Sequence, residues 1–143
     1  MRYIGFKYDF DGKTTEEKNR INLVEREIAD LMFEFYQLTQ RPNYDELSYD
    51  YFEILEKVKL KNIEKFLGER LFLSGGEPSY VDFLVYEWLI KIKVFAPKVW
   101  EKFETTLGAY VDRIENLPRI KEYIAANEPL IFSGPKYFWN PKY

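Results

Sequence analysis

The chain has 143 residues, of which 46% are hydrophobic and 19% aromatic, so its length suits one domain with a sizeable core rather than two. It contains no cysteine and no histidine, which excludes disulfides, thiolate or histidine catalysis, zinc fingers and haem held by either residue. The formal net charge is -3 and the basic residues are scattered, a pattern that is not typical of nucleic-acid binding. No stretch approaches about 18 uncharged apolar residues, so we expect no membrane span and a cytoplasmic protein.

The first predicted element is a long amphipathic helix from Thr14 to Gln40. Thr14 and Glu17 have the spacing of a capping box, in which each side chain bonds the other residue's backbone N–H. Pro42 disfavours helical backbone in the residue before it and marks the end. The apolar residues recur at three- and four-residue intervals, at Ile21, Val24, Ile28, Leu31, Phe35 and Leu38.

A second helix is predicted from about Asp45 to Leu67, followed by Gly68, which adopts a left-handed conformation without steric strain. Because the connection to the first helix is short, the two helices should pack antiparallel. Residues 73–78 are rich in glycine, serine and proline and form the next loop. The apolar pattern of this helix runs through Leu47, Tyr51, Leu55, Val58 and Phe66.

The segment 79–90 has apolar residues around most of the helix circumference, which predicts a central, buried helix. Ser79 and Asp82 are placed as a structural N-capping box at its start. A catalytic role for the Asp82 carboxylate is the alternative, but capping explains this residue fully. Asp82→Ala should therefore lower stability, by about 0.5–2 kcal/mol or more if the site is buried.

Three shorter helices are predicted over 97–103, 106–115 and 118–126. The segment after Asn127 contains Pro129, Pro135 and Pro141, so it is not regular helix. It is also rich in aromatic residues, and we expect it to wrap back over the helices. Nothing in the sequence indicates paired strands. The predicted fold class is all-α.

Two blocks of the sequence resemble the middle of the C-terminal domain of a glutathione transferase. Residues 64–70 read EKFLGER and residues 79–87 read SYVDFLVYE, which is similar to the family's turn and the buried helix that follows it. Three supporting blocks occur in the expected order, at 95–98, 113–120 and 132–140. They are most similar to the mu class, especially its invertebrate and mite members. The resemblance implies a glutathione-transferase C-terminal-type helical bundle.

The resemblance also implies that a domain is missing from this sequence. Members of the family begin with a thioredoxin-like domain that binds glutathione and carries the catalytic tyrosine. Residues 1–13, beginning Met1-Arg2-Tyr3-Ile4, resemble the end of that domain's last helix plus a linker, and residues 14–143 correspond to the helical domain. We therefore expect no catalytic residue in this chain and little or no activity for the chain alone.

By the same resemblance, six residues line the pocket for a hydrophobic electrophile. For the residues on the first helix the alternative is simple helical core, and for the last two it is packing of the C-terminal segment. Gln40 departs from the family pattern, since the mu class often has a tyrosine at this position. These residues are Met32, Phe33, Tyr36, Gln40, Phe132 and Ser133.

Asp30 aligns with an aspartate that contacts glutathione across the dimer, and its alternative role is an ordinary solvated helix residue. The implied function is conjugation of glutathione, as co-substrate, to hydrophobic electrophiles in detoxification by a homodimer, with no metal. Two alternatives stay open. The domain could be a stand-alone interaction module, like the similar domains of translation factors and aminoacyl-tRNA synthetases, or a non-catalytic carrier of hydrophobic ligands.

Overall fold

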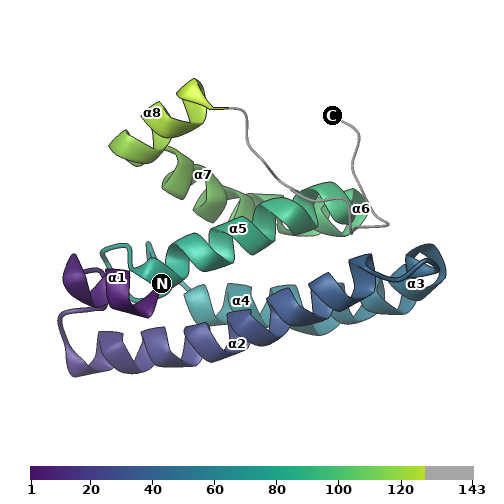
Figure 1. Cartoon of the computed structure of the whole chain (residues 1–143), viewed down its shortest axis with the longest axis horizontal. Coiled ribbons are helices and arrows are strands. Elements are labelled where there is room, and N and C mark those ends of the chain that lie inside the picture. Colours follow the sequence, from purple (N-terminus) through teal and green to yellow (C-terminus); the bar gives the residue numbers. More distant parts are fainter. Residues whose placement is uncertain (128–143) are drawn as a thin grey trace.

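The regular structure of residues 1–127, the part of the chain that the computed structural model describes, is entirely helical. The all-α prediction is therefore confirmed for this part. Figure 1 shows α2 running beside α3 and α4, with α5 packed across them and α7 and α8 beyond α5. The α-helices are α1 (Arg2–Lys7), α2 (Thr15–Thr39), α3 (Tyr44–Ile54), α4 (Leu60–Leu67), α5 (Tyr80–Phe95), α6 (Pro97–Trp100), α7 (Ala109–Glu115) and α8 (Pro118–Ala126).

Helix α2 matches its predicted boundaries because its start is defined by local hydrogen bonds. The backbone N–H of Glu17 donates to Thr14 Oγ1 at 3.1 Å, and the Thr14 N–H donates to Glu17 Oε2 at 2.9 Å. This is the predicted capping box. The six apolar positions expected to face the core are all buried.

The second predicted helix is interrupted by a turn of π-helix, Leu55–Lys59, between α3 and α4. In a π-helix the backbone bonds skip one residue further than in an α-helix, so the wider turn rotates the following side chains. Leu55 is fully buried, but Val58 is 49% exposed, and its inclusion in the apolar stripe is wrong for this reason. Gly68 ends α4 with φ 56° and ψ -133°, a conformation that favours glycine.

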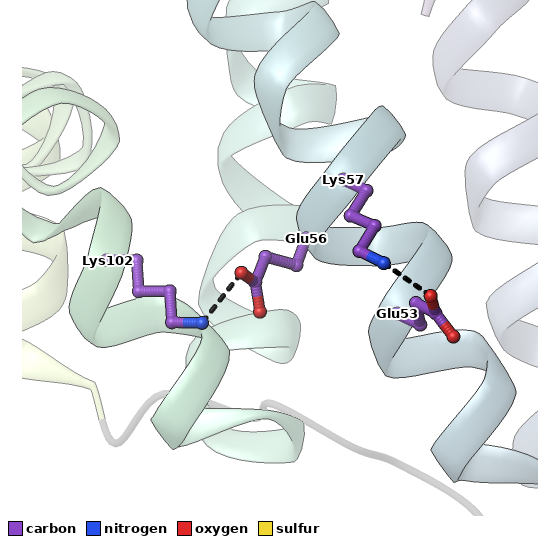
Figure 2. Close-up of polar contacts among 4 residues, drawn as sticks. All are labelled: Glu53, Glu56, Lys57 and Lys102. Atoms are coloured by element: carbon purple, nitrogen blue, oxygen red, sulfur yellow. Dashed lines mark hydrogen bonds and ion pairs between the residues drawn. The ribbon is translucent and has the colours of Figure 1, made fainter.

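The outer side of this helix carries ion pairs, as expected for a solvated face. Lys57 Nζ lies 2.5 Å from Glu53 Oε1, one turn away. Lys102, from the segment after α6, lies 2.6 Å from Glu56 Oε1 (Figure 2). Lys57, Glu53 and Lys102 have side chains that are more than half exposed, and that of Glu56 is partly exposed, so each pair stabilises the fold by at most about 1 kcal/mol.

Helix α5 is the central helix of the described bundle, as predicted. Val81, Trp88, Leu89 and Ile92 are fully buried, and α5 contacts α1, α2, α6 and α7. The segment from 97 to 115 differs from the prediction of two separate helices. A 3-10 turn (Glu101–Phe103) and a second π-helical turn (Glu104–Gly108) join α6 to α7.

Arg20 of α2 holds the loop between α4 and α5 in place. Its Nε donates to the Leu73 carbonyl at 2.9 Å, and its Nη2 donates to the Phe66 carbonyl at 2.9 Å. The guanidinium also lies 4.0 Å from the centre of the Phe66 ring. Burial lowers the pKa of Arg20 from its ordinary value, yet the group stays charged at neutral pH.

Candidate functional site

The four predicted pocket residues on α2 lie close together on its surface. An α-helix turns about 100° per residue, so Met32, Phe33, Tyr36 and Gln40 fall within an arc of about 100°. Met32 and Gln40 are half-buried, whereas Phe33 is 61% exposed and Tyr36 is 45% exposed. The structure therefore brings these residues together on one edge of α2, beside the buried face rather than in it.

Helix α1 sits on the same edge of α2, nearer its N-terminus. The Arg2 guanidinium pairs with the Glu25 carboxylate. Glu25 and Met32 are seven residues apart and hence only about 20° apart around the helix. Met32 and Tyr36 therefore lie on the same edge of α2 as the contact with α1, further toward the C-terminus of α2.

Helix α1 is positioned by a close backbone approach. A Cβ atom on Gly5 would lie 2.4 Å from Cδ1 of Tyr80, the first residue of α5. The Tyr80 N–H donates to the Phe10 carbonyl at 3.0 Å, and the Phe10 and Phe83 rings meet edge to face at 6.3 Å. The sequence offered no signal for this contact, since Gly5 lies inside a short helix.

Gly5→Ala is expected to lower the free energy of unfolding by about 1–3 kcal/mol, since the new methyl group overlaps a buried ring and forces α1 away. Urea denaturation followed by circular dichroism measures the change, and faster hydrogen exchange of the Tyr80 N–H locates it. Gly76→Ala is the matched control, because a Cβ there meets nothing within 4 Å. Equal stability of the two variants would contradict the packing.

A second surface feature lies on another edge of α2, and sequence analysis did not find it. An apolar groove of about 310 Å³ runs between α2 and α4, and its lining includes Leu23, Glu27 and Phe66. Leu23, Glu27 and Asp30 follow one another at four- and three-residue intervals, so the exposed Asp30 lies at the end of this row. None of the four predicted pocket residues on α2 lines the groove. The one available signal was Leu23, which is 62% exposed and lies off the apolar stripe.

Several buried polar atoms in residues 1–127 have no hydrogen-bond partner. Tyr51 lies in an aromatic cluster, with its ring 6.2 Å from that of Phe95. Burial, with the charge of Glu34 adding to it, raises the pKa of the Tyr51 hydroxyl far above its ordinary value, so it stays protonated. The unpartnered atoms are Gln40 Nε2, Tyr51 Oη, Trp88 Nε1 and Trp100 Nε1.

Asp82 is fully buried and its carboxylate accepts four hydrogen bonds. Oδ2 accepts from the N–H and the hydroxyl of Ser79, both at 2.8 Å. Oδ1 accepts from the Leu73 N–H and from the Tyr110 hydroxyl, also at 2.8 Å. Burial is the main cause that raises the pKa of the Tyr110 hydroxyl above its ordinary value, and the nearby charge of Asp82 adds to it. With every oxygen engaged by the protein, the geometry favours the structural interpretation of Ser79 and Asp82.

Two predicted pocket residues, Phe132 and Ser133, lie outside the described residues. Between residues 1 and 127 no group of three or more acidic side chains is placed to hold a metal ion. No helix in this part of the chain is both long enough and apolar enough to cross a bilayer.

The family model for the glutathione S-transferase C-terminal domain matches residues 27–127. A glutathione S-transferase of Dermatophagoides pteronyssinus is 39% identical over 143 residues, which are 100% of this chain and 64% of the relative. Glutathione S-transferase Mu 5 of Homo sapiens is 33% identical over 99% of this chain and 65% of its own length. The crystal structure of the glutathione S-transferase Blo t 8 superposes with a TM-score of 0.77 at 27% identity, covering 87% of this chain and 59% of that one. The chain therefore belongs to the glutathione S-transferase C-terminal domain family.

Proposed function

We propose that this chain supplies the electrophile-binding surface of a mu-like glutathione transferase that acts in cytoplasmic detoxification. The observation that carries the proposal is the position of Met32, Tyr36 and Gln40 on α2. They lie on the same edge of this helix as Glu25, the residue that pairs with Arg2 of α1. A domain built onto α1 would lie along this edge and face these side chains. Phe33 borders the same surface, and we assign Phe132 and Ser133 to it from the resemblance.

The contribution of this surface to the reaction is positioning. In the proposed enzyme the glutathione thiolate attacks an electrophilic carbon, and a tyrosine hydroxyl of the preceding domain lowers the thiol pKa. The apolar side chains Met32, Phe33 and Tyr36 would hold the electrophile beside the sulfur and exclude water from it. Such positioning converts an encounter in solution into a reaction between neighbours and accounts for a large part of a rate enhancement.

We further propose that residues 1–13 pack as the end of a thioredoxin-like domain. Apolar side chains in and just after α1 are exposed in the described structure. Single exposed apolar residues are common on protein surfaces, but several of them in one short segment indicate a surface that another part of a protein covers. A cavity of about 510 Å³ between α1 and α2, lined in part by Tyr3, Phe6 and Ile21, adds to this surface. The exposed apolar residues are Met1, Tyr3, Ile4, Phe6, Tyr8 and Phe10.

The proposed enzyme is a homodimer in which α2 and the α3–α4 helix face the partner subunit. The support is the apolar groove between α2 and α4, because a contiguous apolar surface of this kind is typical of a protein–protein interface. Asp30, in line with Leu23 and Glu27 of this groove, would reach glutathione bound by the partner. This arrangement gives the two edges of α2 separate roles, one toward the electrophile and one toward the second subunit.

The proposal predicts that the native protein, captured from its source with an antibody to this chain, has an intact mass above 17.3 kDa by about one thioredoxin-sized domain. The native protein should conjugate glutathione to a hydrophobic electrophile, whereas the 143-residue chain should show no rate above the uncatalysed reaction. A native mass of 17.3 kDa would contradict the proposal and favour an interaction module. Saturable dye binding that does not depend on glutathione would then point to a carrier.

A further inference from the structure

We infer that the linker between α1 and α2 carries a site of spontaneous backbone modification, at which Asp11 converts to isoaspartate through a cyclic imide with Gly12. The reaction needs no enzyme, and it does not depend on the proposed function. In it, the backbone nitrogen of one residue attacks the side-chain carboxyl carbon of the aspartate before it. A side chain on the attacking residue hinders this approach, and glycine is the residue without one.

The pair of Asp11 and Gly12 is the sequence feature that permits the reaction. Of the seven glycines in the chain, Gly12 is the one that follows an aspartate or an asparagine. The fold requires glycine here, because its φ is +83° and a Cβ atom would lie 3.0 Å from Glu17 Cβ and 3.2 Å from the Lys18 backbone nitrogen. The structure thus keeps the least hindered nucleophile directly after an aspartate.

The atoms that would react are weakly held by the rest of the protein. Asp11 Oδ2 lies 3.8 Å from Lys18 Nζ, too far for a hydrogen bond, and within residues 1–127 this carboxylate accepts no other. The Gly12 N–H likewise has no acceptor in the described part of the chain. Both residues are half-buried, and Asp11 borders the cavity of about 510 Å³ between α1 and α2, which is large enough to admit water. The ring can therefore close and be hydrolysed in the folded chain.

The other aspartates lack this combination. Asp9 lies in the same linker, but the N–H that follows it belongs to Phe10 and donates to the Gly5 carbonyl at 2.8 Å. The rest lie within helices, whose fixed backbone keeps the following nitrogen from turning toward the side chain. They are Asp30, Asp45, Asp50, Asp82 and Asp112. Asp11 is therefore the aspartate at which we expect the modification.

The chemistry conserves every atom. The Gly12 nitrogen forms a bond to the Asp11 Cγ carbon, and the carboxyl hydroxyl leaves with the proton of that nitrogen as one water. Water then adds to one of the two carbonyl carbons of the five-membered imide and breaks its bond to the nitrogen. Cleavage at the side-chain carbonyl restores aspartate, whereas cleavage at the main-chain carbonyl routes the backbone through Cβ and gives isoaspartate. The product has the mass of the parent and one more carbon in its main chain.

This extra carbon falls between two anchored points of the chain. The Phe10 carbonyl accepts a hydrogen bond from the Tyr80 N–H of α5, and Thr14 begins α2 with its capping box. Isoaspartate lengthens the short connection between these points and moves the carboxylate that faces Lys18. We expect the hydrogen bond between Tyr80 and Phe10 to open more often, which loosens α1 from α5.

The test incubates the 143-residue chain at neutral pH and physiological temperature for several weeks. Isoaspartate is then labelled with a carboxyl methyltransferase that acts on this residue, and the label is located by peptide mapping. We expect most of the label on the peptide that contains Asp11, with faster hydrogen exchange of the Tyr80 N–H in the aged chain. Asp11→Glu keeps the charge but needs a six-membered imide, which closes much more slowly, so this label should be lost. Asp112→Glu, the same change at an exposed position of α7, is the matched control and should leave the label unchanged.

A synthetic peptide of residues 7–15 separates the chemistry of the linker from its structure. It is too short to fold, so it shows how readily the pair reacts when nothing holds it. Labelling of the peptide but not of the folded chain would overturn the inference, because the structure would then protect the linker. A label spread evenly over several aspartates, or one that survives Asp11→Glu, would also overturn it. Labelling at Asp11 with unchanged exchange at Tyr80 would contradict the loosening of α1.

Discussion

Asp82→Ala is expected to lower the free energy of unfolding by about 3–5 kcal/mol, more than the loss of an ordinary helix cap. The substitution leaves the Leu73 N–H, the Ser79 N–H and the Tyr110 hydroxyl without their acceptor in a fully buried site. Each unpaired buried donor costs about 1–3 kcal/mol, partly offset by relaxation. Urea denaturation of the chain, followed by far-ultraviolet circular dichroism, measures the change.

Two variants test the cause of that loss. Tyr110→Phe removes one of the four hydrogen bonds and leaves no donor unpaired, so the expected loss is about 1 kcal/mol. Asp112→Ala changes an exposed carboxylate on the same helix as Tyr110 and should alter stability by less than about 0.5 kcal/mol. If Asp82→Ala proves no more harmful than Asp112→Ala, the carboxylate does not organise this part of the fold.

Trp88→Ala should be about as damaging, with an expected loss of about 3–5 kcal/mol. Trp88 lies in the middle of α5 with 0% of its surface exposed, and it is among the largest fully buried side chains of the described residues. Its removal leaves a cavity among helices that pack on several sides of α5, and such a site does not collapse easily. Since domains are typically stable by about 5–15 kcal/mol, this loss is a large share of the total stability, and the variant should melt at a markedly lower temperature.

Trp88→Phe distinguishes lost volume from lost chemistry. Phenylalanine keeps a large aromatic ring and removes an indole N–H that has no partner, so we expect a loss of less than about 1.5 kcal/mol. Glu87→Ala, at the neighbouring exposed position, removes an ion pair with Lys91 and should change stability by only a few tenths of a kcal/mol. Thermal melts of the three variants should therefore rank Trp88→Ala far below the other two. Similar melting of Trp88→Ala and Trp88→Phe would contradict a cavity as the cause.

The parts of the fold that sequence predicts well are those governed by neighbours along the chain. The capping boxes at Thr14 and Ser79 depend on residues three positions apart, and both are present. The apolar period of α2 and the near-uniform hydrophobicity of α5 likewise depend on local spacing, and they correctly separate an edge helix from a central one.

The parts that sequence does not predict depend on contacts between distant residues. Tyr110 reaches Asp82 across 28 positions, and Arg20 reaches the Leu73 carbonyl across 53, with no motif that marks either pair. Exposure is also decided by tertiary packing. A helical wheel places Met32, Phe33 and Tyr36 on one edge of α2. It does not predict that Met32 is half-buried and that Phe33 is exposed to solvent.

The candidate site was predicted only as a set of positions. The resemblance to the family identified the positions of the row that ends at Gln40, where the mu class often has a tyrosine. The structure adds that the Gln40 amide nitrogen is buried without a hydrogen-bond partner, which the sequence does not indicate. The groove beside α4 had no motif of its own, since its lining comes from residues scattered between Leu23 and Val85.

The π-helical turn at Leu55–Lys59 affects how the length of this chain can vary. A π turn arises when one extra residue is accommodated within an α-helix, and the helices on either side keep their original faces. A related gene that lacks one codon in this region would encode an uninterrupted helix with the same buried side chains. The loss or gain of one residue here would therefore leave the same faces of α3 and α4 buried. The same change within α5 would rotate its capping box relative to its buried side chains.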